Sequence, residues 1–186
     1  MTRGKLYIIT GTSAVGKTSI ADLVLKKLRN FQRSLTYTTR PPRGQEKNEV
    51  AYNFITNELF RKKIKKGEFL EWANNYGNLY GTNKKDILAL INRGKNVLVV
   101  IDIKGAINIK KNWPAATSIF ILPESVKQLE KRFKKRGDTK TTEIKHRLNV
   151  ARWELGQAYH CDFWVINREN KINQAVREVL DIINSK

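Results

Sequence analysis

The chain has 186 residues, of which 40% are hydrophobic, so it fits one compact unit with a real core rather than a disordered chain. Its formal net charge of +19 indicates a basic surface around a phosphate-handling site, and an additional contact with nucleic acid stays open. Cys161 is the only cysteine, which excludes an intramolecular disulfide and favours a structural thiol in a reducing compartment.

In chain order, apolar runs of strand length alternate with segments of helical spacing, which predicts an α/β fold with a parallel sheet covered on both faces. The predicted strands are Lys5–Thr10, Asn96–Ile101, Ala116–Leu122 and Asp162–Ile166. The predicted helices are Gly16–Arg29, Lys104–Asn112, Ser125–Lys135, Thr141–Ala158 and Ile172–Ile183.

The stretch Ser34–Gly81 breaks this alternation and predicts a small mixed insertion. It contains the Pro41-Pro42 turn and, further on, strand-like pieces at Tyr52–Ile55 and Phe69–Trp72 with a helix at Glu58–Lys66. Later in the chain, Gly137-Asp138-Thr139 separates two charged helical segments and predicts a mobile loop.

The N-terminal residues and the apolar runs indicate where in the cell the protein is located. Met1–Gly4 leads directly into a strand, which leaves no room for a signal or transit peptide, and Val97–Ile101 is far too short to span a membrane. We therefore expect a cytoplasmic enzyme with no membrane partner. No basic motif interleaved with aromatic residues is present, so no specific nucleic-acid partner is predicted. A monomer and a homodimer both stay open.

The first predicted strand runs into a complete phosphate-binding motif. Gly11-Thr12-Ser13-Ala14-Val15-Gly16-Lys17-Thr18 matches G-x-x-x-x-G-K-[ST], with a buried strand before it and a helix after it. Backbone N–H groups of such a loop wrap a phosphate, Lys17 reaches the β- and γ-phosphates, and the Thr18 hydroxyl ligates Mg²⁺. The motif predicts binding of a nucleoside triphosphate without separating a kinase from a GTPase or an ATPase.

Two groups of arginines are placed for phosphoryl transfer, in which negative charge spreads over the moving phosphate. Arg40 and Arg43 flank the stiff Pro-Pro turn, a spacing that suits one phosphate monoester, although an exposed basic turn is the alternative. Arg132 and Arg136 lie four residues apart on one helical face, and Arg147 lies early in the next helix. These three can close over ATP as a lid, or belong to a solvated lysine-rich helix.

Asp102 ends the second predicted strand, where the carboxyl ends of parallel strands form the ligand crevice. Its side chain can contact Mg²⁺-bound water or substrate, or it can cap the helix that follows.

Taken together and in order, these segments resemble the guanylate kinase family over nearly the whole chain. The resemblance rests on the phosphate-binding loop and on six further motifs, which are Thr38-Thr39-Arg40-Pro41-Pro42-Arg43, Tyr52-Asn53-Phe54, Glu68–Ala73, Tyr80-Gly81-Thr82, Ile101–Gly105 and Arg132–Gly137. It implies transfer of the γ-phosphoryl group of ATP to GMP, with Mg²⁺ as cofactor and acceptance of dGMP as well.

The resemblance also implies roles for single residues. Arg40, Arg43, Tyr52 and Tyr80 hold the GMP phosphate, while Thr36, Glu71, Thr82 and Asp102 surround the base. Glu71 accepts from guanine N1–H and the 2-amino group, two donors that adenine lacks at those places. Arg136 and Arg147 clamp the transferring phosphate with Lys17 and Arg40, Arg132 belongs to the ATP side, and Asn167 lies near adenine.

Several positions depart from the family pattern. Ala14 replaces a glycine and adds strain if the position needs positive φ. Thr18-Ser19 reverses the usual order, Ala51 and Val100 stand where acidic residues are common, and Lys104 replaces a glutamine.

The resemblance divides the chain into a core (1–33, 83–125 and 159–186), a GMP-binding subdomain (34–82) and a lid region (126–158). The alternatives are a related P-loop kinase that acts on a ribosyl phosphate, which Glu71, Thr36 and Thr82 oppose, and a guanylate-kinase-like binding module, which an intact Lys17-Thr18 opposes.

Overall fold

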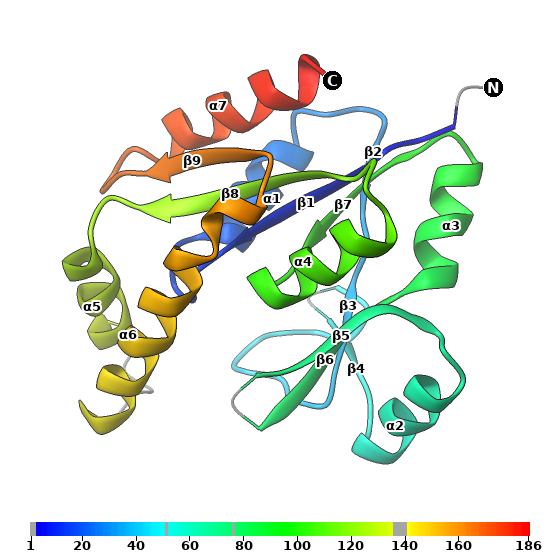
Figure 1. The fold of residues 1–186 in the computed structure, drawn as a ribbon, viewed down its shortest axis with the longest axis horizontal. Helices are drawn as coiled ribbons and strands as arrows, with labels where there is room; N and C mark the ends of the chain where they lie inside the picture. The colour runs from blue at the N-terminus through cyan, green and yellow to red at the C-terminus, as the bar shows by residue number, and fades with distance from the viewer. Residues whose placement is uncertain (1–2, 51, 76, 136–140) are drawn as a thin grey trace.

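A computed structural model describes residues 3–50, 52–75, 77–135 and 141–186 of the chain. Five parallel strands form its central sheet in the order β2-β7-β1-β8-β9 (Figure 1). Their bounds are β1 Leu6–Gly11, β2 Phe31–Arg33, β7 Asn96–Val100, β8 Thr117–Pro123 and β9 Phe163–Asn167. β1 lies in the middle, paired with β7 from Leu6 opposite Val97 and with β8 from Tyr7 opposite Thr117.

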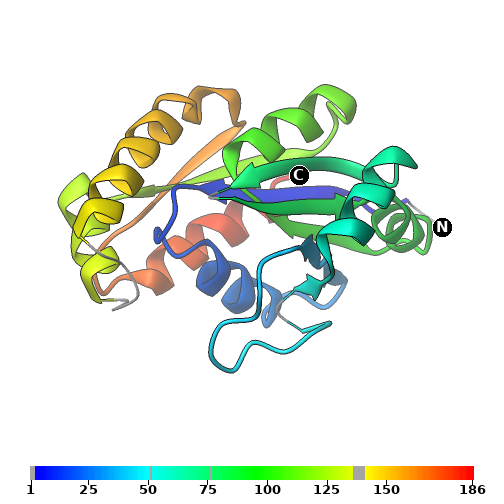
Figure 2. The ribbon, with the colours of Figure 1, turned by 90° about the horizontal axis from the view of Figure 1, so that it is seen from below.

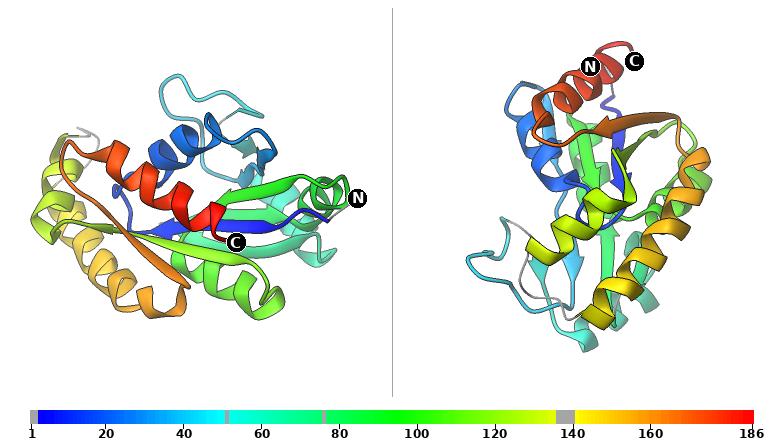
Figure 3. Two further views of the ribbon diagram at one scale, coloured as in Figure 1. Left: turned by 90° about the horizontal axis from the view of Figure 1, so that it is seen from above. Right: turned by 90° about the vertical axis from the view of Figure 1, so that its left-hand side faces the viewer.

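Helices cover both faces of this sheet, as predicted. Figure 2 shows α1 (Lys17–Leu25) and α7 (Ile172–Asn184) on one side of the strands and α4 (Ile103–Asn112) on the other. α3 (Lys84–Asn92) shares the core with α4, and α7 lies alongside α1 (Figure 3). The side chains of β1 alternate between the two cores, with Tyr7 and Ile9 in one and Leu6 and Ile8 in the other. This alternation follows from the period of two in a strand that is buried on both faces.

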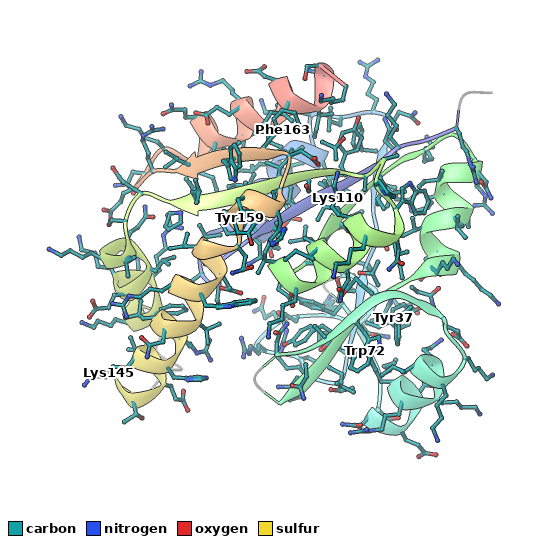
Figure 4. The ribbon with its side chains drawn as sticks, in the orientation of Figure 1. Tyr37, Trp72, Lys110, Lys145, Tyr159 and Phe163 are labelled. Carbon is teal, nitrogen blue, oxygen red and sulfur yellow. The ribbon has the colours of Figure 1, made fainter. Side chains whose placement is uncertain are left out.

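The segment after β2 forms a second, smaller sheet in the order β4-β3-β6-β5. Its elements are β3 Thr36–Thr38, β4 Asn53–Phe54, β5 Phe69–Asn75 and β6 Asn78–Asn83, with α2 Asn57–Lys65 packed beside them. Figure 1 shows this unit as a separate lobe below the central sheet. Tyr37 and Trp72, labelled in Figure 4, belong to its strands.

Helices α5 (Val126–Lys135) and α6 (Thr141–Gly156), followed by a 3₁₀ turn at Ala158–His160, connect β8 to β9. Lys110 of α4 pairs with Asp162 at 3.0 Å, and Asp162 also accepts from the backbone and hydroxyl of Ser118, which fastens α4 to the beginning of β9. Burial raises the pKa of the neighbouring Cys161 thiol to about 11, in keeping with a structural cysteine.

Four elements were missing from the sequence prediction, namely β2, β3, β6 and α3, and the first helix ends at Leu25 rather than Arg29. β2 is a three-residue edge strand, and β6 contains Gly81, so neither carries a strong apolar period. α3 offers only Ile87 and Ile91 as buried positions, and its beginning is marked by Asn83, whose side chain accepts from Lys85 N–H at 2.8 Å. Among the described helices, none has the length and apolar character needed to cross a membrane.

Candidate nucleotide site

The loop between β1 and α1 has the backbone geometry of a phosphate cradle. Gly11 and Gly16 have φ of 142° and 101°, and neither has room for a side chain. A Cβ on Gly11 would lie 2.4 Å from the carbonyl oxygen of Ile121, and one on Gly16 would lie 2.7 Å from Nδ2 of Asn167. The loop therefore depends on glycine at both ends for conformation and for space.

Ala14 has a φ of 63°, so the residue that replaces the family's glycine does adopt the left-handed conformation. For alanine this region costs roughly 1–2 kcal/mol relative to the right-handed one. The strain expected from the sequence is present.

The loop is held from outside through its carbonyl groups. Val15 O accepts from Arg132 Nη1 and from Asn167 Nδ2, both at 2.7 Å, and Arg132 also reaches Ala14 O at 3.2 Å. Gln128 in turn donates to the carbonyl of Asn167 at 3.2 Å. Two residues expected to face ATP thus fasten α5 and the end of β9 to the loop, a supporting role that the spacing of charges did not indicate.

Lys17 donates from Nζ to the carbonyls of Gly11 and Thr12, both at 2.8 Å, so its ammonium group lies over the beginning of the loop. Thr18 follows in the first turn of α1 with an exposed side chain. Thr12 Oγ1 is buried without a hydrogen-bond partner in the described part of the chain. The entrance of the loop thus holds a positive charge and a buried hydroxyl.

Glu154 of α6 also reaches this loop, and the sequence prediction missed it. Its carboxyl accepts a hydrogen bond from the backbone N–H of Ser13, and it is 91% buried, being 9% exposed. Burial raises the pKa of this carboxyl to about 7, the charge of Lys17 opposes the shift, and Asp102 adds to it. Glu154 lies seven residues after Arg147 on the same helix, a spacing that places both residues on one face. This spacing is the sequence feature from which Glu154 could have been predicted as a site residue.

On the second sheet, Glu71 of β5 is opposite Thr82 of β6. Its carboxyl is buried, and its Oε1 accepts from the Thr82 hydroxyl at 2.6 Å. Burial raises the pKa of Glu71 to about 8, the Thr82 hydrogen bond opposes this, and the negative charge of Asp102 adds to it. Thr36 of β3 is opposite Thr82 on its other side, so three of the predicted base-contacting residues do come together.

Asp102 caps α4, with Oδ1 accepting from Gly105 N–H at 2.9 Å, and its other oxygen accepts from Asn75. Asp102 raises the pKa of both Glu71 and Glu154, so its carboxyl lies near enough to interact with each of them. A pocket of about 170 Å³ opens there, lined by Asn75, Asp102, Lys104, Val150, Trp153 and Glu154. Lys104 lies 5.1 Å from the Trp153 ring centre, so the departure at this position joins α4 to α6.

The residues of the insertion that were predicted to bind a phosphate lie around Arg40, which is buried. Its guanidinium donates to Glu46 at 2.9 and 3.1 Å and lies 5.3 Å from the Tyr52 ring centre. A hydrogen bond also joins Arg40 and Tyr80. Glu46, which sequence reasoning missed, accepts from the backbone N–H of Arg43 as well, whereas the Arg43 residue is exposed.

The lid arginines are placed only in part. Arg136 lies outside the described residues, as do Ala51 and the predicted mobile loop 137–139. Arg147 is on α6, with its guanidinium carbon 5.9 Å from the ring centre of Phe133 on α5. Val100, at the end of β7, is half-buried, and nothing in the structure explains its replacement of an acidic residue.

Comparison with known proteins agrees with this geometry. A family model described as guanylate kinase matches residues 3–186. The chain is 42% identical over 184 residues to a guanylate kinase of Thermotoga maritima, covering 99% of this chain and 88% of the relative. It is 41% identical over 181 residues to one of Prochlorococcus marinus, covering 97% of each chain.

A solved structure is similar as well. The crystal structure of guanylate kinase from Anaplasma phagocytophilum superposes with a TM-score of 0.82 at 26% identity, covering 99% of this chain and 86% of that one. Because the superposition covers 99% of this chain, it includes both the central sheet and the insertion. The chain therefore belongs to the guanylate kinase family.

Proposed function

We propose that this chain transfers the γ-phosphoryl group of ATP directly and in line to GMP, giving ADP and GDP, as the activity of its family requires. The observation that carries the proposal is the buried carboxyl of Glu71, which is held by the Thr82 hydroxyl at 2.6 Å. Asp102 raises the pKa of this carboxyl and also that of Glu154, which accepts from Ser13 of the phosphate-binding loop. A carboxylate at that place suits the paired donors of guanine and faces an acceptor in adenine.

On the ATP side, the backbone of residues Gly11–Thr18 wraps the phosphates and Lys17 supplies positive charge. Its ammonium group already lies against the first carbonyls of the loop, so a small rotation brings it to a bound phosphate. Arg132 and Asn167 keep the loop in shape through Val15 O. Arg136 and Arg147 of the lid complete the charge around the moving group when the lid closes.

On the acceptor side, Arg40 and Arg43 bind the GMP phosphate together with Tyr52 and Tyr80. Glu46 supports this group, because it joins the guanidinium of Arg40 to the backbone of Arg43 across the Pro-Pro turn. Thr36, Thr82 and Asp102 surround the base beside Glu71. The acceptor phosphate is thus aimed at the loop from the neighbouring lobe.

Mg²⁺ fits the oxygen donors present, since the exposed Thr18 hydroxyl lies in the first turn of α1, immediately after the loop, and hard cations prefer such ligands. Bound there with ATP, Mg²⁺ would neutralise phosphate charge. The protein's own part is to present Thr18 from a rigid helix and to keep Asp102 and Glu154 at the same entrance.

The proposal includes the division into a core (1–33, 83–125, 159–186), a GMP-binding subdomain (34–82) and a lid region (126–158). A cytoplasmic location is part of it and agrees with the single buried cysteine. Acceptance of dGMP, and a monomeric or homodimeric state, stay predictions.

An ADP-release assay with Mg²⁺ and a panel of acceptors tests the proposal. We expect GMP and dGMP to be phosphorylated and AMP and ribose phosphates to be poor acceptors. Equal activity on ribose phosphates would favour the ribosyl phosphate kinase, and binding of GMP without ADP release would favour a binding module.

A further inference from the structure

The first turn of α4 approaches the guanine-side carboxyl more closely than a side chain would allow. A Cβ on Gly105 would lie 2.6 Å from Oε2 of Glu71 and 3.0 Å from its Cδ. Gly105 is buried, and its φ is not in the left-handed region, so its backbone makes no demand for glycine. Because glycine inside a helix costs about 1 kcal/mol relative to alanine, its presence calls for another reason.

That reason is the position of the carboxyl. Glu71 is held on one side by the Thr82 hydroxyl at 2.6 Å and on the other by the bare backbone of Gly105. Gly105 N–H also donates to Asp102 at 2.9 Å, so this turn of α4 cannot withdraw without losing its cap. The carboxyl therefore occupies a gap whose width depends on the missing side chain.

The atom that alanine would displace is the end of a flexible side chain. Beyond the two Glu71 atoms, the nearest atom to the Cβ position is Ile101 Cδ1 at 3.3 Å, which is tight but belongs to another movable side chain. A methyl group at residue 105 would thus move the Glu71 carboxyl while leaving the backbone of α4 and β5 in place.

We propose that Gly105 is a specificity-determining positioning residue, which holds the Glu71 carboxyl against the guanine edge by having no side chain. This inference rests on the proposed function, in which Glu71 reads guanine. A misplacement of about 1 Å at a reacting or recognition group is enough to cost about a hundredfold in rate.

The test is Gly105→Ala, assayed with GMP and with AMP. We expect kcat/KM for GMP to fall about 10- to 100-fold, mainly through KM, with activity on AMP unchanged, so that the ratio between them falls equally. The melting temperature should stay the same or rise, because alanine favours the helix. Gly156→Ala is the matched control, since Gly156 ends α6 and no atom of the described residues lies within 4 Å of its Cβ position. This substitution should leave the kinetics unchanged.

A double variant separates this proposal from the function on which it rests. In a Glu71→Ala background there is no carboxyl to displace, so adding Gly105→Ala should change kcat/KM for GMP less than twofold. A full additional loss in that background, wild-type kinetics in Gly105→Ala alone, or a marked fall in its melting temperature would each overturn the role of Gly105. Failure of the proposed function looks different, because wild-type protein would then not phosphorylate GMP, or Glu71→Ala would not change the preference for GMP over AMP.

Discussion

The phosphate-binding loop and the proposed guanine pocket take their polar groups from different sources. The loop uses the backbone of consecutive residues, with positive φ at Gly11, Ala14 and Gly16. The guanine pocket uses side chains from separate elements, with Glu71 on β5, Thr82 on β6 and Asp102 before α4. A site built from backbone is insensitive to most side chains but depends on its few glycines, whereas a site built from side chains depends on what packs behind each of them.

The strongest test of the loop is the removal of the lysine charge that the proposed mechanism requires. Lys17→Met should lower kcat/KM for ATP about a thousandfold or more, because in the proposed site its ammonium group supplies the positive charge at the β- and γ-phosphates. The fold should persist, since the bonds from Lys17 to Gly11 O and Thr12 O are local. An ADP-release assay with a circular dichroism spectrum measures both, and retained activity would contradict the transfer mechanism.

The corresponding test of the guanine pocket is Glu71→Gln, which keeps the shape but replaces one acceptor by a donor. We expect the GMP-to-AMP ratio of kcat/KM to fall at least a hundredfold, because the amide cannot accept from both N1–H and the 2-amino group. Glu68→Gln is the control, since the Glu68 carboxylate pairs with Lys63 at the beginning of the same hairpin. A ratio unchanged in Glu71→Gln would place guanine recognition elsewhere.

This contrast also explains what the sequence could predict. The loop was predicted residue by residue, including the strain at Ala14, because motif and flanking elements are contiguous. Glu71 was found only through the family resemblance, and Glu46 and Glu154 were not found. Glu154 contacts Ser13 from a helix that lies about 140 residues further along the chain. No local period encodes such an approach. Gly105 closes the motif Ile101–Gly105, but the motif does not say that its backbone lies against Glu71.

The two buried carboxyls should give the two sites opposite pH dependences. In the proposed function guanine needs the ionised form of Glu71, whose pKa is raised to about 8 by burial and by Asp102, against the hydrogen bond from Thr82. GMP binding below pH 8 must therefore release a proton, and KM for GMP should fall about tenfold between pH 7 and pH 8.5.

Calorimetry at pH 7 in two buffers of different ionisation enthalpy measures that proton directly. Glu71→Gln should lose the buffer dependence, apart from the titration of the GMP phosphate itself. Equal proton release in both proteins would show that Glu71 is already ionised.

Glu154 should act in the opposite direction. Its carboxyl accepts from Ser13 N–H near Lys17, with Asp102 and Lys104 also in reach, and its pKa is raised to about 7. As pH rises from 6 to 8 the carboxylate forms and repels the phosphates, so ATP affinity should weaken several-fold. Glu154→Gln should remove that part of the trend, as measured by titration of each protein with Mg²⁺–ATP. A steeper weakening in the variant would mean that the carboxylate helps to hold the metal or Lys17.

The same carboxyls affect stability with a sign that follows from linkage. Each binds its proton more tightly in the folded chain than in the unfolded one, so the free energy of unfolding falls as pH rises from about 4.5 through 7 for Glu154 and through 8 for Glu71. The free energy of unfolding, measured by denaturation, should be lower at pH 8.5 than at pH 5.5. Glu71→Gln and Glu154→Gln should each reduce this difference by the contribution of the carboxyl that is replaced.

The smallest expected effect concerns the loop's own backbone. Ala14→Gly removes the strain of a φ of 63°, at about 1–2 kcal/mol, but glycine also increases the entropy of the unfolded chain, at about 0.4–1 kcal/mol. The net gain of about 0.5 kcal/mol should raise the melting temperature by about 1–2 °C while KM for ATP changes less than twofold. Ala21→Gly, on buried α1 with helical backbone, is the matched control and should lower it instead. If both substitutions were equally destabilising, the left-handed conformation of Ala14 would carry no cost, and the loop would tolerate a side chain there as readily as the helix does.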